Sequence, residues 1–108
     1  GNCAEFCEIE NHFLVNGTDN LVQFTEPGDN YGCMDQAAVG TVPNQYGTWW
    51  YGRNGWCPGK EVPITRVDIT DQVTLGASNS FQYLATFGGE PYPGGDARQE
   101  TTAWLVFY

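Results

Sequence analysis

Polar and apolar residues alternate along several short stretches of this chain. Alternation with a period of two is typical of a β-strand that buries one face. Two such stretches, residues 12–16 and 20–25, flank the turn sequence Asn-Gly-Thr-Asp at 16–19, so they predict a β-hairpin. We find no convincing amphipathic helix, because no segment repeats its apolar residues at a helical period.

Three later stretches predict further strands. Residues 66–70 alternate with Val67 and Ile69 facing inward, and Asp71 is placed to cap one helical turn ending at Gly76. Residues 80–87 place four apolar side chains on one face, namely Phe81, Tyr83, Ala85 and Phe87.

The last stretch, residues 101–108, is apolar on both faces, so we expect it to be a central or covered strand. Short alternating strands joined by glycine-rich turns predict an all-β antiparallel sandwich. Two segments do not look like strands: residues 26–63 and the surface loop at 88–99. Long irregular segments inside a compact domain are usually functional.

Composition limits the possible functions. With 108 residues and 41% hydrophobic residues, the chain is long enough for one folded domain with its own core. Its 4 Lys and Arg against 13 Asp and Glu leave a net charge of −9. Four cations do not assemble a basic patch, so we expect neither nucleic acid nor an anionic membrane surface as a partner. No apolar run approaches the roughly 18 residues of a membrane span.

The four cysteines predict two disulfides, and three pairings are possible. The most local choice joins Cys3 to Cys7 and Cys33 to Cys57. If Cys3 and Cys7 pair, the backbone between them must form a tight loop that presents Glu5 at its centre. Zinc is the weaker alternative, because His12 is the chain's one histidine.

Further motifs each allow two interpretations. Asn16-Gly17-Thr18 is an N-glycosylation sequon, which suits a secreted chain, but Asn-Gly alone also marks a turn. Acidic residues in turns are candidate calcium ligands, although they match no calcium-loop pattern: Asp19, Asp29, Asp35 and Asp96. Glu8 and Glu10 are interpreted as surface charge, and His12 is expected to face solvent or its hairpin partner.

Aromatic residues cluster at Trp49, Trp50, Tyr51 and Trp56. Their ring faces suit stacking on sugar rings, and the alternative is that they pack the long loop against the sandwich. We favour packing for Trp56, which precedes a cysteine, and keep both interpretations for the other three.

The Cys-x-Glu-x-Cys motif at 3–7, followed by a hairpin and then by Arg-x-x-Trp-Cys-Pro-Gly at 53–59, resembles the C-terminal jelly-roll domain of the peptide-N-glycosidase F family. The resemblance covers most of the chain, without that domain's first strand. It implies a jelly roll with a long disulfide-restrained loop. It also implies disulfides between Cys3 and Cys7 and between Cys33 and Cys57, and an active-site role for Glu5. It also implies that the principal catalytic Asp lies on a first jelly roll outside this sequence.

Two hypotheses follow. In the first, residues 1–108 form a single secreted jelly-roll domain, a fragment of a larger protein, that binds a glycan or glycoprotein or has a structural role. In the second, the chain is half of a glycoamidase that hydrolyses the N-glycan–asparagine amide, with Glu5 at the site. Neither hypothesis requires a metal or cofactor. We also expect another chain or a missing segment to supply a strand to the sandwich.

Overall fold

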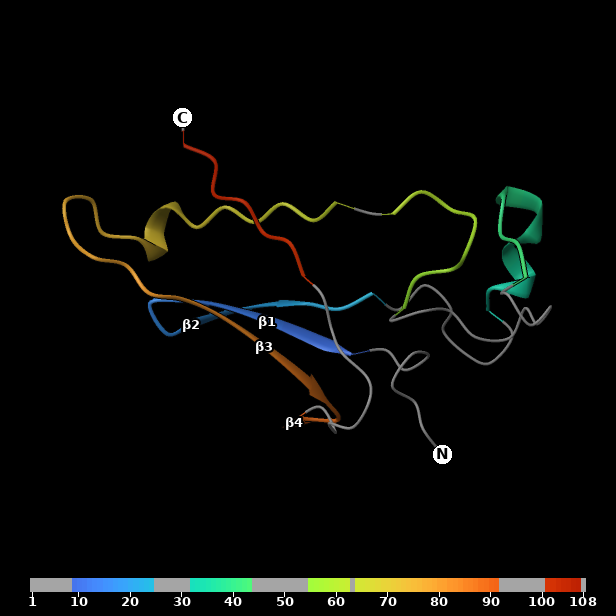
Figure 1. Cartoon of the computed structure of the whole chain (residues 1–108), viewed down its shortest axis with the longest axis horizontal. Coiled ribbons are helices and arrows are strands. Elements are labelled where there is room, and N and C mark those ends of the chain that lie inside the picture. Colours follow the sequence, from blue (N-terminus) through green and yellow to red (C-terminus); the bar gives the residue numbers. More distant parts are fainter. Residues whose placement is uncertain (1–8, 25–31, 44–54, 63, 92–100, 108) are drawn as a thin grey trace.

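The computed structural model describes residues 9–24, 32–43, 55–62, 64–91 and 101–107. Its regular elements are β1 (Glu10–Val15), β2 (Thr18–Val22), β3 (Phe81–Phe87) and β4 (Glu90–Pro91), with two 3₁₀ helices, η1 (Met34–Val39) and η2 (Thr70–Gln72). The strands form one antiparallel sheet in the order β2-β1-β3-β4 (Figure 1). The described part of the chain is therefore mostly β, with little helix, as the sequence predicts.

The predicted hairpin is confirmed, with a tighter turn than expected. The first residue pair next to the turn is Val15 opposite Thr18, so only Asn16 and Gly17 connect β1 to β2. Both connecting residues have positive φ, +49° and +83°. This combination is the pattern of a type I′ turn, in which Asn-Gly is the preferred sequence because both residues tolerate the left-handed region. β2 consequently begins two residues before the predicted strand.

β3 confirms the predicted strand at 80–87, and besides its sequence neighbour β4 it pairs with β1, which lies far away in the sequence. Phe13 lies opposite Tyr83, and their rings are 5.3 Å apart between centroids. On the same face, the hydroxyl of Tyr83 donates to Oδ1 of the buried Asn11 at 2.7 Å. This face therefore supplies the packed side of the sheet, with Ile9 and Val15 buried at its two ends.

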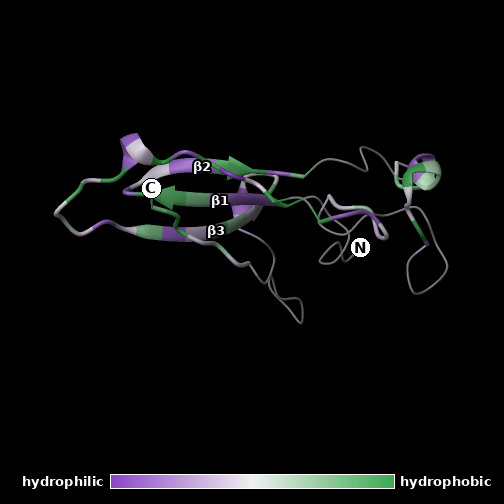
Figure 2. Ribbon diagram, turned by 90° about the horizontal axis from the view of Figure 1, so that it is seen from above, coloured by the Kyte–Doolittle hydropathy of each residue, from purple (hydrophilic) through white to green (hydrophobic). Residues whose placement is uncertain are grey.

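A disulfide joins Cys33 to Cys57 outside the sheet, and η1, which follows Cys33, lies at the other end of the molecule from the β1–β2 turn (Figures 1 and 2). The pairing is the one that the resemblance implies. η1 begins directly after Cys33 and is capped at its C-terminus by Gly40, whose φ is +112°. Gly59 packs so closely under this turn that a Cβ there would lie 2.5 Å from the Gly40 carbonyl oxygen.

The strand predicted at 66–70 is wrong. This segment contains no strand, and Val67 is 47% exposed instead of facing inward. The Asp68 carboxylate accepts hydrogen bonds from the backbone N–H and the hydroxyl of Thr70, at 2.9 and 2.6 Å. Such local side-chain bonds compete with strand pairing, and they turn the chain into η2. The helical turn thus starts at Thr70 without a cap from Asp71.

The last predicted strand is also wrong within residues 101–107. These residues form no strand and all are exposed, with Trp104 and Phe107 each at 84%. An apolar stretch becomes a strand only when another strand shares its backbone hydrogen bonds, and none of the described strands pairs here. The sandwich and jelly-roll arrangement remain predictions, since the described strands form a single sheet. No helix in the described ranges is long and apolar enough to cross a membrane.

The disulfide generates a stability prediction. Replacing Cys33 and Cys57 together by alanine should lower the free energy of unfolding by about 3.5 kcal/mol, because the open chain regains the entropy of a 24-residue loop. Urea unfolding followed by tryptophan fluorescence measures this difference. Alanine avoids burying a hydroxyl at two sites that are at most 1% exposed. An unchanged unfolding midpoint would contradict the prediction.

Candidate functional site

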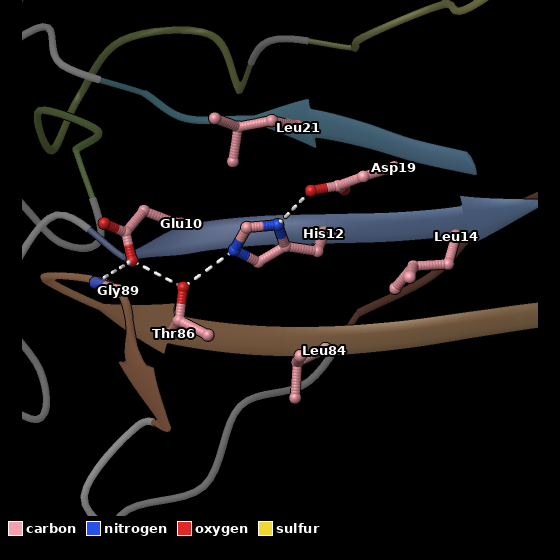
Figure 3. Close-up of a pocket in the computed structure, with 8 residues that line it drawn as sticks. All are labelled: Glu10, His12, Leu14, Asp19, Leu21, Leu84, Thr86 and Gly89. Carbon is pink, nitrogen blue, oxygen red and sulfur yellow. Dashed lines mark hydrogen bonds and ion pairs between the residues drawn. The ribbon is translucent and has the colours of Figure 1, made fainter. Parts of the chain in front are cut away.

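One face of the sheet carries a line of polar side chains from three strands. Glu10 and His12 are two apart on β1 and so project to the same side. The strand register places Thr86 of β3 opposite Glu10. Asp19 of β2 lies on the same face, opposite Leu14 and two residue pairs along from His12. Figure 3 shows these four side chains side by side across the sheet.

The four side chains form a continuous hydrogen-bonded chain. Asp19 Oδ2 lies 2.7 Å from His12 Nδ1, and His12 Nε2 lies 2.7 Å from Thr86 Oγ1. The Thr86 hydroxyl donates to Glu10 Oε2 at 2.5 Å, and the same oxygen accepts the Gly89 N–H at 3.3 Å. We call Asp19, His12, Thr86 and Glu10 the polar chain.

The direction of each bond follows from where the protons are. The Thr86 hydroxyl gives its one proton to Glu10, so it accepts from Nε2 of His12. Nδ1 of His12 lies against the Asp19 carboxylate, which can only accept a hydrogen bond. An imidazolium, with an N–H on both nitrogens, satisfies every contact in the polar chain at once.

Electrostatics at the end of the polar chain favour a charged Glu10. The hydrogen bond from the Thr86 hydroxyl lowers the pKa of Glu10 below its ordinary value of 4.5, and the Gly89 N–H and the charge of His12 add to this effect. Partial desolvation acts in the opposite direction and is outweighed. Glu10 is thus a surface charge, as the sequence indicates, that also accepts hydrogen bonds from Thr86 and Gly89.

Leucines surround the polar chain and form a shallow, open hollow of about 370 Å³. Leu14, Leu21 and Leu84 come from β1, β2 and β3, and Gly89 closes one end (Figure 3). Leu21 is 55% and Leu84 is 44% exposed, so both present apolar surface to the solvent. The hollow therefore offers apolar contacts beside the half-exposed carboxylate of Asp19.

The order Asp19, His12, Thr86 is that of a carboxylate–imidazole–hydroxyl triad in acyl transfer. Two features argue against such chemistry here. Thr86 is only 7% exposed, and its proton is given to Glu10 instead of the imidazole. The nearby Gly89 N–H also bonds to Glu10, so it is not directed at a developing oxyanion. The geometry suits holding three strands together and offering a binding surface.

The structure tests only some of the predicted site residues. Glu5, Trp49, Trp50 and Tyr51 lie outside the described residues, as do Cys3 and Cys7. Cys33 and Cys57 are joined. Trp56 is partly buried and its indole N–H donates to the Lys60 carbonyl at 3.2 Å, a packing arrangement. No group of three or more His, Cys, Asp or Glu side chains in the described ranges is placed to hold a metal ion.

Sequence reasoning missed the polar chain. His12 does contact its hairpin partner through Asp19, as expected, but its second contact is to Thr86, 74 residues away. One signal was available, because Glu10 and His12 sit on one face of a strand in an otherwise alternating pattern. Nothing in the sequence placed Thr86 beside them.

Comparison with known proteins identifies relatives. The family model described as "Peptide-N-glycosidase F, C terminal" matches residues 1–107. The chain is 32% identical over 104 residues to the peptide-N(4)-(N-acetyl-beta-D-glucosaminyl)asparagine amidase F of Elizabethkingia miricola. That match covers 96% of this chain and 27% of the relative, so the chain spans about a quarter of the relative's length. No solved structure matches the chain significantly.

The lowered pKa of Glu10 predicts a pH-dependent contribution to stability. A carboxyl group whose pKa falls on folding stabilises the protein above its unfolded pKa, and this contribution is lost as the pH falls through the folded value. Glu10→Gln should therefore lower the melting temperature at pH 7, and the deficit should shrink as the pH falls below 4.5.

Thermal unfolding from pH 7 to pH 3 measures this difference. Glu90→Gln is the matched control, because Glu90 is an exposed strand carboxylate with no side-chain hydrogen bond in the described part of the chain. An equal deficit for Glu10→Gln at every pH would show that its carboxylate charge contributes nothing.

Proposed function

Because this chain belongs to the peptide-N-glycosidase F C-terminal domain family, we propose that it is a disulfide-bonded jelly-roll module of a longer extracellular protein. Its task there is to bind a glycan or a neighbouring protein segment, or to support the structure of the whole. One observation carries this proposal. The family match extends over residues 1–107, yet the chain aligns with only 27% of its relative.

The exposed apolar residues support a module that contacts other parts. Residues 101–107 present Trp104, Val106 and Phe107 at exposures of 69% or more, and Leu75 is 91% exposed. Large apolar surfaces on a soluble domain mark interaction sites. A strand from another chain or segment is the occupant that suits residues 101–107, since this apolar stretch lacks a pairing partner among the described strands.

An extracellular location agrees with the Cys33–Cys57 bridge. Disulfides form and persist in oxidising compartments, whereas thiols in the cytosol are kept reduced. A glycan or glycoprotein is the ligand class that we propose for the aromatic cluster of Trp49, Trp50 and Tyr51. Aromatic faces contact the apolar faces of sugar rings, and a chain of net charge −9 suits a neutral ligand better than an anionic one.

A second candidate function is half of a glycoamidase. Glu5 occupies the position of the Glu in the family's Cys-x-Glu-x-Cys motif, and the relative is named as an asparagine amidase. Hydrolysis of such an amide requires one group to activate water and another to stabilise or protonate the leaving group. Glu5 supplies one such group, so a second must come from another segment or chain.

The two functions differ in what the isolated chain does. We expect residues 1–108 alone to release no glycan from an N-glycopeptide, because one carboxylate does not make an acid–base pair. Mass spectrometry of the peptide product measures release, with the relative's amidase as a positive control. Release that disappears in Glu5→Gln would overturn the binding-module proposal and favour the enzyme.

Glycan binding is tested separately. Replacing Trp49 and Trp50 together by alanine should weaken binding to an N-glycopeptide at least tenfold, because each stacked ring contributes apolar contact and aromatic interaction. Isothermal titration calorimetry measures the affinity. Trp104→Ala is the matched control, since Trp104 is exposed and lies in a different segment. Equal affinities for wild type and the double variant would exclude the cluster as the glycan site.

A further inference from the structure

Asn16 does more than form the hairpin turn. Its side-chain nitrogen, Nδ2, donates to the Gln72 carbonyl and to Asn79 Oδ1, both at 2.8 Å. Its side-chain oxygen accepts the Ser80 N–H, also at 2.8 Å, and its backbone N–H donates to the Ser80 carbonyl. The Asn16 side chain thus uses both of its amide hydrogens and its oxygen on residues 56 to 64 positions away.

The partners of Asn16 are held in the orientation that it needs. Asn79 Oδ1 also accepts the Thr74 N–H at 2.8 Å, while Asn79 Nδ2 donates to the carbonyls of Thr74 and Ala77. Rotating the Asn79 amide to present a donor to residue 16 would break all three of these bonds. Gln72 is held as well, because its side-chain amide bonds reciprocally with the amide of Asn20.

We propose that the Asn16 side-chain amide is a chemically sensitive latch, which fastens the 72–80 loop to the β1–β2 turn and which any modification of its nitrogen opens. Figure 1 shows the turn, η2 and the start of β3 at the same end of the sheet. The latch works only with an NH₂ group, because two acceptors face Nδ2 and each takes one hydrogen.

Deamidation is the modification to which this position is chemically disposed. In an Asn-Gly sequence, the glycine backbone nitrogen loses its proton and attacks Cγ of the asparagine. A bond forms between Gly17 N and Asn16 Cγ, the Cγ–Nδ2 bond breaks, and Nδ2 leaves as ammonia. Water then opens the succinimide to aspartate or isoaspartate, so the balance is one water taken up and one ammonia released. The aspartate product carries a carboxylate oxygen at the position of Nδ2, where the Gln72 carbonyl and Asn79 Oδ1 each require a hydrogen-bond donor.

The same geometry bears on the sequon at Asn16. A glycosylated asparagine keeps only one hydrogen on Nδ2, because the sugar replaces the other. It can serve either the Gln72 carbonyl or Asn79, not both, and the sugar would have to occupy the place of the remaining acceptor. A closed latch and a glycan at Asn16 are therefore mutually exclusive.

Three substitutions separate the latch from the turn. Asn-Gly, Asp-Gly and Gly-Gly all suit a type I′ turn, so Asn16→Asp and Asn16→Gly keep the turn and remove the latch. Gln82→Glu makes the same amide-to-carboxylate change at an exposed residue of β3, with no side-chain hydrogen bond in the described part of the chain. Hydrogen exchange at the Thr74 and Ser80 amides reports on the loop, because side chains of the latch accept these N–H groups.

We expect both Asn16 variants to exchange at Thr74 and Ser80 about tenfold faster than wild type, the effect of losing a hydrogen-bonded contact. Gln82→Glu should exchange at the wild-type rate. Exchange in Asn16→Asp and Asn16→Gly that equals wild type would overturn the latch.

Chemical sensitivity is tested without changing Asn16. Asn79→Ala removes one of the two acceptors of Nδ2, and incubation at pH 8 followed by peptide mass spectrometry measures conversion of Asn16 to aspartate. We expect Asn16 of the variant to convert to aspartate faster than in wild type. A side-chain amide with fewer hydrogen bonds more often adopts the geometry in which the Gly17 nitrogen can attack its Cγ. Conversion no faster than in wild type would show that the latch does not protect this amide.

Discussion

The pairing of β1 with β3 is the interaction on which the described structure depends. The pair of the two strands that is nearest in sequence, Val15 and Phe81, is separated by 66 positions. Closing a flexible loop of this length costs about 4 kcal/mol plus a constant, which the pairing must offset. Only this pairing makes β1 an interior strand, and it brings together Phe13 with Tyr83 on one face and Glu10 with Thr86 on the other.

The two faces of β1 stabilise this pairing by different means. On the packed face, apolar burial at Ile9 and Val15 is combined with an aromatic contact and with a buried amide that is fully engaged. On the opposite face, the polar chain links β2, β1 and β3 through bonds of 2.5 to 2.7 Å. A charge-assisted chain of this kind is specific, because each member has one arrangement of protons that satisfies its neighbours.

The sheet and the disulfide region each hold a different part of the chain in place. The Cys33–Cys57 bridge joins the start of η1 to the described segment at 55–62, while the sheet holds the loop at 72–80 through the latch. Both regions leave large apolar side chains exposed, at Val39 and Val42 near the bridge and at 101–107 beyond the sheet. This distribution supports the proposal that the domain contacts other parts of a longer protein.

The sequence alone determined the β1–β2 hairpin turn, the strand β3 and the family. Asn16-Gly17 specifies its turn because few residue pairs accept two positive φ values, and the alternation at 80–87 located β3. The two cysteine motifs indicated the family and the bridge between Cys33 and Cys57, each of which is now observed. These features depend on a few neighbouring residues or on a short motif.

Tertiary structure alone decided which alternating segments become strands and which polar residues meet. Residues 66–70 alternate as clearly as β3, and residues 101–107 are apolar on both faces as a covered strand would be, yet neither segment forms a strand, because a strand needs a partner for its backbone hydrogen bonds. His12 and Thr86, or Asn16 and Asn79, are neighbours only through the β1–β3 pairing, at separations of 74 and 63 residues. Contacts between residues so distant in sequence follow from the register of the sheet, which no local pattern in this chain specifies.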